Sequence, residues 1–276
     1  MELKGALRMK NRACRVVCGV SILLAGLIYL AVAVYQPFYP QEGDKTLDGG
    51  NAVADVTNKN LGYIRIKHSA TKKRLKVRMT KDGVTLTYDL NSEGLYEVYP
   101  FQLGDGTYVV TVYKQLSGND YTTVVRWNVK VALTDPLSPF LCPNQYIWYH
   151  EDDDAVAVAR DICGGMDDQS KCLAVLDYIA KHVKYDFFSA MKVESTYLPE
   201  PDQTLQKGKG ICFDYAALMC AMLRSQGVPA KLMIGYADKM YHAWVNAYVG
   251  DAWVQYDPTF KSTGNKANTY TVERWY

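Results

Sequence analysis

The chain has 276 residues, of which 49% are hydrophobic and 22% charged, a composition typical of globular proteins rather than of disordered ones. This length leaves room for two modest domains, each able to bury a core. The formal net charge is only +2, and because residues 1–15 alone carry +4, the rest of the chain carries −2. No extended basic surface is indicated, so we exclude nucleic acid as a partner.

Residues 1–15 form a basic head, and a run of nineteen uncharged residues, 16–34, follows it. We therefore predict that residues 1–35 are a membrane or signal segment. The run is long enough to span a bilayer with its positive flank in the cytoplasm. A cleaved signal peptide is the alternative, because Ala31-Val32-Ala33 has the small residues of a cleavage site. We therefore expect a single-pass cell-membrane protein with extracytoplasmic domains, or a secreted protein if the segment is removed.

Residues 36–60 contain several prolines and glycines and are predicted to form a linker above the membrane. Residues 61–134 alternate polar and apolar side chains between turn sequences, which is typical of a β-sandwich. The predicted strands are 63–68, 74–79, 84–90, 95–101, 108–115 and 121–133. Residues 105–112 resemble a late strand of an immunoglobulin or fibronectin type III domain. We expect an immunoglobulin-like sandwich that acts as a spacer or docking module without chemistry of its own.

Three prolines between residues 136 and 143 end the predicted sheet, so a second domain is expected from 135 to 276. Its first helix is predicted to run from Asp152 to Cys163, and its second from a Ser170 cap to about Lys184. Residues 187–206 are polar and weakly patterned. They predict a long loop that lines a substrate cleft.

Cys212 follows the glycine-broken segment 208–210 and precedes an apolar run, 216–223, of helix-forming composition. Gly227 suits the left-handed backbone at a helix C-terminus. Cys212 is therefore predicted in the first turn of a helix. There, unpaired N–H groups and the helix dipole favour a thiolate over a thiol, as a sulfur nucleophile requires.

Two alternating segments, 241–249 and 252–257, are predicted to form a hairpin around Gly250-Asp251. A two-residue or a four-residue loop gives the same register, and His242 and Asp257 then share one face as diagonal neighbours within side-chain reach. A three-residue loop would put them on opposite faces. The sequence thus offers a thiol at a helix tip and an imidazole–carboxylate pair, which are the nucleophile, base and orienting group of a catalytic triad.

Cysteines beyond residue 35 are odd in number, so at least one thiol stays free. They are Cys142, Cys163, Cys172, Cys212 and Cys220. A nucleophilic role requires the free thiol to be Cys212. Cys163 and Cys172 are the nearest plausible disulfide pair, and Cys220 is expected to be buried in a helix. No spacing indicates a structural zinc site, and we predict no metal and no cofactor.

Three motifs occur in order: Gly210-Ile-Cys212-Phe-Asp-Tyr-Ala, His242-Ala-Trp244, and Trp253 followed after three residues by Asp257-Pro-Thr. Together they resemble the bacterial form of the transglutaminase-like superfamily of cysteine enzymes, over about residues 136–276. The resemblance implies a papain-like α+β catalytic domain. It also implies that Cys212 is the nucleophile, that His242 is the general base and acid, and that Asp257 orients the imidazole.

Two further residues are candidates for oxyanion or substrate contacts. Gln206 lies six residues before Cys212, a spacing that resembles the oxyanion-hole glutamine of papain-like enzymes. Trp244, together with Trp253, is expected to wall the site and limit the access of water. The chain departs from many relatives at 245–247, where it lacks their acidic residue; this puts a metal-regulated role there in doubt but not the triad.

The function expected from this resemblance is acyl transfer or hydrolysis at amide or peptide bonds through a thioester on Cys212. The substrate would be a protein or peptide, cell-wall or surface associated. The alternative is a non-catalytic surface module that keeps the fold for binding or structure. The intact set of Cys212, His242 and Asp257 favours the enzyme, because a binding fold does not need all three.

Overall fold

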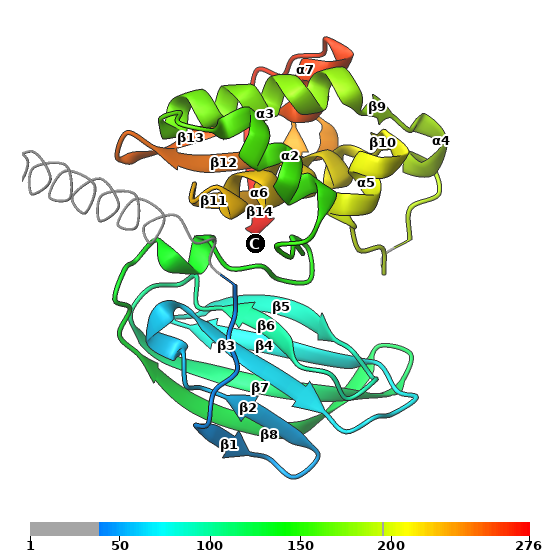
Figure 1. Ribbon diagram of the computed structural model, residues 1–276. Helices are drawn as coiled ribbons and strands as arrows, with labels where there is room; N and C mark the ends of the chain where they lie inside the picture. Colours follow the sequence, from blue (N-terminus) through cyan, green and yellow to red (C-terminus); the bar gives the residue numbers. More distant parts are fainter. Residues whose placement is uncertain (1–38, 195) are drawn as a thin grey trace, which may run out of the picture. The chain divides into compact units, whose positions relative to one another are not determined.

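The computed structural model describes residues 39–194 and 196–276, and the chain from Phe38 to Tyr276 forms one compact unit (Figure 1). The predicted membrane or signal segment lies outside the described residues. Among the helices that are described, none combines the length and the apolar character needed to cross a bilayer.

Two four-stranded antiparallel sheets make up the β lobe, residues 46–131. One sheet has the order β1-β2-β3-β6, with strands Thr46–Asp48, Ala52–Asp55, Tyr63–His68 and Glu97–Pro100. The other has the order β5-β4-β7-β8, with strands Val84–Leu90, Leu75–Lys81, Gly106–Ser117 and Asp120–Val131. All six predicted strands are present. The predicted linker 36–60 is wrong in part, because β1 and β2 lie within it and pair onto β3.

The alternation of buried and exposed side chains along each strand explains the packing of the β lobe. In β4 the side chains of Leu75, Val77 and Met79 are buried and belong to a core that draws on both sheets. The turn between β4 and β5 has positive φ at both Asp82 and Gly83, as a type I′ hairpin requires.

The α/β lobe, residues 154–276, is built on a four-stranded antiparallel sheet of order β13-β12-β11-β14. Its strands are Ala252–Tyr256, Met240–Val249, Ala230–Ala237 and Tyr270–Trp275. A separate parallel pair joins β9 (Lys184–Tyr185) and β10 (Lys209–Gly210). The helices are α2 (Asp154–Cys163), α3 (Asp168–His182), α4 (Phe187–Ala190), α5 (Pro201–Lys207), α6 (Cys212–Ser225) and α7 (Pro258–Thr263). Short 3-10 turns occur at Lys59–Leu61 and Ser138–Phe140.

Helix α6 is the centre of this lobe. It packs against β11 and β12 and also contacts α2, α3 and α5 (Figure 1). Its residues from Asp214 to Ser225 are all buried, which accounts for the near-continuous apolar sequence, since a helix that is apolar all round must be surrounded by protein. The mixed α+β class predicted for this domain is confirmed.

Two local predictions in this lobe need correction. Helix α3 begins two residues before Ser170, because the Asp167 carboxylate is the cap and accepts a hydrogen bond from the Ser170 N–H at 2.8 Å. The predicted loop 187–206 contains α4 and most of α5, whose first residue is Pro201, the favoured position for proline in a helix.

The C-terminal residue joins the two lobes. The Tyr276 hydroxyl donates to the Thr87 carbonyl at 3.1 Å, and its ring packs edge-on against Tyr88, with 5.2 Å between ring centroids. Nearby, the Asp89 N–H donates to the Gln145 side chain at 2.6 Å. These contacts fix β5 of the β lobe beside the end of β14.

Candidate active site

Two glycines set where α6 starts. Gly208 ends α5 in the left-handed conformation, with φ of 60°. A Cβ on Gly210 would come within 2.7 Å of the Asp214 Cβ, so this position needs glycine. Because Gly210 has no side chain, the Asp214 carboxylate has room to accept a hydrogen bond from the Ile211 N–H at 2.8 Å. This bond fixes Cys212 as the first residue of the helix.

A two-residue turn sets the register of the hairpin. Gly250 and Asp251 both have positive φ, 57° and 62°, and the strands pair from Val249 opposite Ala252 to Val245 opposite Tyr256. The predicted register is confirmed. It brings the His242 and Asp257 side chains together, with 2.8 Å between His242 Nε2 and Asp257 Oδ2.

The Asp257 carboxylate is held at both oxygens. It is the cap of α7 and accepts a hydrogen bond from the Phe260 N–H at Oδ1, at 2.9 Å. The Tyr270 hydroxyl donates to Oδ2 at 2.8 Å, beside His242. Pro258 occupies the first helical position, where no N–H is needed. The Asp-Pro-Thr sequence is therefore a helix start that aims a carboxylate at an imidazole.

His242 is only 3% exposed, and its ring stacks on Phe260 with 4.5 Å between centroids. Burial lowers the pKa of His242, but the hydrogen bond that His242 donates to Asp257, the interaction with the Cys212 thiol and the charges of both outweigh it, and the pKa is raised to about 9. The imidazole is thus mainly protonated at neutral pH. Because Nε2 is bound to Asp257, Nδ1 is left for the thiol.

Tyr185 is a site residue that sequence reasoning missed. The parallel pairing of β9 with β10 places Tyr185 opposite Gly210, two residues before Cys212. Tyr185 lines the same cavity as Cys212, and burial together with the interaction with the Cys212 thiol raises the pKa of Tyr185 to about 12. A neutral hydroxyl donor therefore lies in the cavity of the thiol, where it is a candidate for stabilising the charge that develops on a carbonyl oxygen.

Two predicted contact residues lie elsewhere. Gln206 is exposed on α5, and its side-chain amide donates to Asp202 at 2.9 Å and to Asp154 at 3.1 Å, so it does not reach the thiol. Trp244 is 1% exposed and packs edge-on against Tyr270, with 4.9 Å between centroids. Trp244 supports the Asp257 side of the site from behind rather than forming a wall of the cleft.

Cys212 and His242 open into one cavity of about 600 Å³. Its lining also includes Tyr185, Tyr197, Phe213, Ile234, Tyr241 and Arg274. Cys212 is half-buried and is a free thiol. The other four cysteines of the described chain are buried free thiols as well, so the bridge predicted between Cys163 and Cys172 is not formed. The arrangement presents one accessible sulfur beside an oriented imidazole, which is the geometry for nucleophilic attack on a carbonyl.

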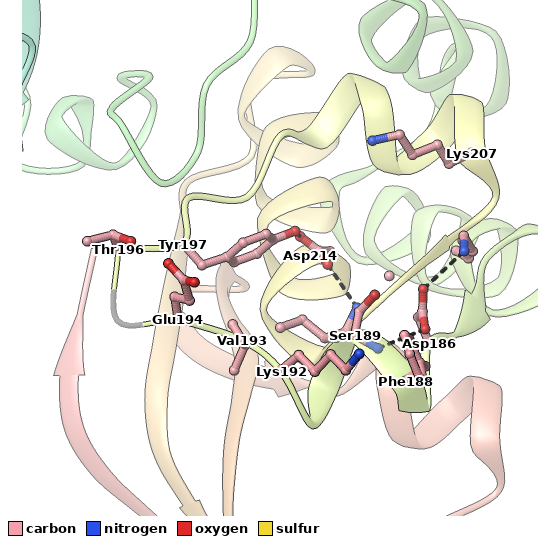
Figure 2. A pocket seen from close by; sticks show the side chains of 13 residues that line it. Asp186, Phe188, Ser189, Lys192, Val193, Glu194, Thr196, Tyr197, Lys207 and Asp214 are labelled. Carbon is pink, nitrogen blue, oxygen red and sulfur yellow. Dashed lines mark hydrogen bonds and ion pairs between the residues drawn. The ribbon is translucent and has the colours of Figure 1, made fainter.

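A second cavity of about 690 Å³ adjoins the first and shares Tyr197 and Ile211 with it. Figure 2 shows the Tyr197 ring reaching toward Asp214, to which its hydroxyl donates at 2.7 Å. Lys192 and Phe188 lie on the opposite side of this space (Figure 2). The side chains that start α6 thus also form the wall between the two cavities.

Residues 156–258 match the sequence model of the family described as "Transglutaminase-like superfamily". Among curated proteins, an uncharacterized protein of Mycobacterium leprae (strain TN) is 34% identical over 67 residues, 20% of this chain and 24% of that protein. The chain therefore spans about a quarter of the length of the curated relative that it matches. The matched segment 156–258 contains Cys212, His242 and Asp257.

Three solved structures are similar at low identity. A candidate cysteine protease from Cytophaga hutchinsonii is 19% identical, with a TM-score of 0.40, over 71% of this chain and 78% of that chain. The periplasmic domain of TgpA from Pseudomonas aeruginosa is 16% identical, with a TM-score of 0.38, over 80% of this chain and 77% of that chain. Red sea bream transglutaminase is 11% identical, with a TM-score of 0.33, over 71% of this chain and 48% of that chain. All three TM-scores are below 0.5.

Replacing Asp257 by Asn tests the cause of the raised His242 pKa. The carboxylate stabilises the imidazolium, so Asp257→Asn is expected to lower the His242 pKa from about 9 by about 1–2 units. NMR titration of the His242 ring protons measures the midpoint. Asp251→Asn, in the exposed turn of the same hairpin, is the matched control and leaves it unchanged. An equal midpoint in wild type and Asp257→Asn would contradict the assignment.

Proposed function

From the match of residues 156–258 to the transglutaminase-like superfamily, we propose that the chain is a cysteine enzyme acting on amide or peptide bonds through a thioester. The observation that carries the proposal is that the Cys212 thiol and His242 line one cavity, with His242 hydrogen-bonded to Asp257. A fold kept only for binding does not require a buried imidazole held between a free thiol and a fixed carboxylate.

In the first half-reaction, the Cys212 thiolate attacks the carbonyl carbon, and the carbonyl π electrons move to oxygen. The negative oxygen is stabilised by the Cys212 N–H, at the positive end of the α6 dipole, and by the Tyr185 hydroxyl. When the tetrahedral intermediate collapses, the C–N bond breaks and protonated His242 gives its proton to the departing nitrogen. A thioester on Cys212 and a free amine or ammonia result.

In the second half-reaction, neutral His242 takes a proton from the incoming nucleophile as it attacks the thioester. Water gives a carboxylate and restores the thiol; an amine gives a new amide bond. The same residues serve both outcomes, because only the identity of the nucleophile differs. Asp257 keeps the imidazole in place while its charge changes, and Tyr270 and the Phe260 N–H keep Asp257 in place.

We also propose that the enzyme works outside the cytoplasm. The support is the uncharged run 16–34 behind a basic head, which acts as a single-pass membrane anchor or as a signal that is removed. Its substrate is then a protein or peptide at the cell surface or in the wall. The β lobe belongs, in this proposal, to the immunoglobulin-like kind of sandwich, supported by its two antiparallel sheets.

Replacing Cys212 by Ala tests the enzymatic proposal. With casein as the acyl donor and a fluorescent primary amine as the acceptor, wild type is expected to incorporate amine or release ammonia and peptides. Cys212→Ala should lower that activity on the order of 10³-fold or more, because the nucleophile is lost. Cys163→Ala is the control at a buried thiol. Equal activity in Cys212→Ala and wild type would overturn the role of Cys212 as nucleophile, and the absence of activity in wild type would leave the non-catalytic surface module as the function.

Replacing Tyr185 by Phe tests the oxyanion role. The variant keeps the ring but removes the hydroxyl donor, so kcat is expected to fall by about 10²-fold with KM nearly unchanged. Steady-state kinetics, with a substrate that wild type is found to use, measure kcat and KM separately. Tyr178→Phe, on α3, is the matched control with unchanged kinetics. A rise in KM alone would show that Tyr185 binds substrate without stabilising the oxyanion.

A further inference from the structure

The active-site cavity continues toward the β lobe. Tyr197, Phe213, Ile234 and Arg274 line the cavity that holds Cys212, and the same four residues line a further cavity of about 250 Å³. The rest of that cavity is formed by the end of the α/β lobe and by β4 and β5, with Arg74, Lys76, Thr87, Tyr88, Asp89, Tyr146 and Tyr276. We call this extension the β-lobe branch of the cleft.

Positive charge in this branch exceeds negative charge. Arg74 is committed to Asp89 through two hydrogen bonds, of 2.7 and 3.1 Å, so these two charges offset each other. Lys76 and Arg274 remain. Within residues 39–194 and 196–276, neither of them has a carboxylate oxygen within 4.0 Å.

Both of these cations make contacts that leave donors for a ligand. The Arg274 guanidinium donates to the Tyr241 hydroxyl at 2.7 Å, and a guanidinium has five N–H donors in all. The Lys76 ammonium lies 5.5 Å from the centroid of the Tyr121 ring, a contact with an aromatic face that uses no hydrogen bond. Arg274 is exposed on β14, and Lys76 is half-buried on β4.

The cavity on the other side of Tyr197 has a different charge balance. Its three lysines, Lys192, Lys207 and Lys209, are equal in number to its three carboxylates, Asp186, Glu194 and Asp214. Lys209 forms an ion pair with Asp186 at 3.2 Å. Glu194 also lines the cavity that holds Cys212, so negative charge lies on that side of the thiol. An uncompensated positive field is therefore found only toward the β-lobe branch, among these three connected cavities.

We propose that the β-lobe branch is a substrate subsite that binds a carboxylate of the peptide substrate, with Arg274 and Lys76 as its recognition groups. The inference rests on the proposed function and deepens it, because it states which substrates reach the thiol. A guanidinium and an ammonium that line one cavity match a carboxylate, which can accept two charge-assisted hydrogen bonds. In this proposal the β lobe takes part in substrate specificity, beyond the spacer or docking role expected from its sequence.

Alkylation of Cys212 provides the test, because it needs no knowledge of the natural substrate. The probes are N-iodoacetyl-glycyl-glutamate amide and N-iodoacetyl-glycyl-glutamine amide, which have nearly the same shape and differ by one negative charge. In each reaction the Cys212 sulfur bonds to the probe's methylene carbon and iodide leaves. Iodoacetamide is the small neutral reference, and peptide mass mapping of the full chain locates the label.

In wild type, the glutamate probe is expected to label Cys212 about 10-fold faster than the glutamine probe, as for one charge-assisted contact. Arg274→Gln and Lys76→Gln should each reduce this ratio, and the double variant should bring it to about 1. Arg274→Lys should keep most of it. Lys72→Gln, an exposed lysine of the β lobe that does not line the cleft, should leave it unchanged. In every variant the two probe rates are divided by the iodoacetamide rate of the same variant, and iodoacetamide should still label Cys212 ahead of the buried cysteines, which also shows that the site remains folded.

Two outcomes overturn different statements. A wild-type ratio near 1 together with normal iodoacetamide labelling, or a ratio that survives in the double variant, overturns the carboxylate subsite and leaves the proposed function intact. Failure of iodoacetamide to label Cys212 ahead of the buried cysteines overturns the proposed function itself.

Discussion

The hydrogen bond between His242 and Asp257 depends on two backbone features that lie outside the bond. One is the two-residue turn at Gly250–Asp251, whose positive φ angles set the hairpin register; a shift of one residue would turn the two side chains to opposite faces. The other is the start of α7, where capping fixes one Asp257 oxygen on a backbone N–H and leaves the second for the imidazole. Geometry at the site is therefore set by secondary structure, which is stiffer than a loop.

The sulfur reaches this pair from a separate part of the chain. The left-handed Gly208 and the side-chain-free Gly210 allow α6 to begin at Cys212, and residues 214–225 of that helix are buried. The β9–β10 pairing then brings Tyr185 to the same point. Three segments thus meet at one cavity, each held by backbone contacts rather than by side-chain fit. A reaction that needs a nucleophile, a proton carrier and an oxyanion donor finds all three already placed, which lowers the ordering cost of the transition state.

Much of this site could be predicted from local sequence signals. Glycines before an apolar run predicted the Cys212 helix start, and the Gly250-Asp251 turn predicted the register that joins His242 to Asp257. Tyr185 and Tyr270 could not be predicted, because their partners are distant in sequence and no turn or period encodes a contact between separate elements. The expected oxyanion contact of Gln206 is missing for a related reason. The six-residue spacing from Cys212 assumes that Gln206 lies in a loop, but it lies in α5, which turns its side chain toward Asp154 and Asp202. β1 and β2 were missed because each is too short to show alternation.

The central claim is that Cys212 forms a covalent acyl intermediate. Rapid acid quenching of the full chain during turnover, followed by intact-mass and peptide-mass measurement, tests it most directly. We expect a mass increase equal to the acyl part of the donor, located on the peptide that contains Cys212 and removed by hydroxylamine, as a thioester is. The increase should be greater in Asp257→Asn if its second half-reaction is slowed more than its first. Turnover without any adduct on Cys212, or with the adduct on another residue, would contradict the account.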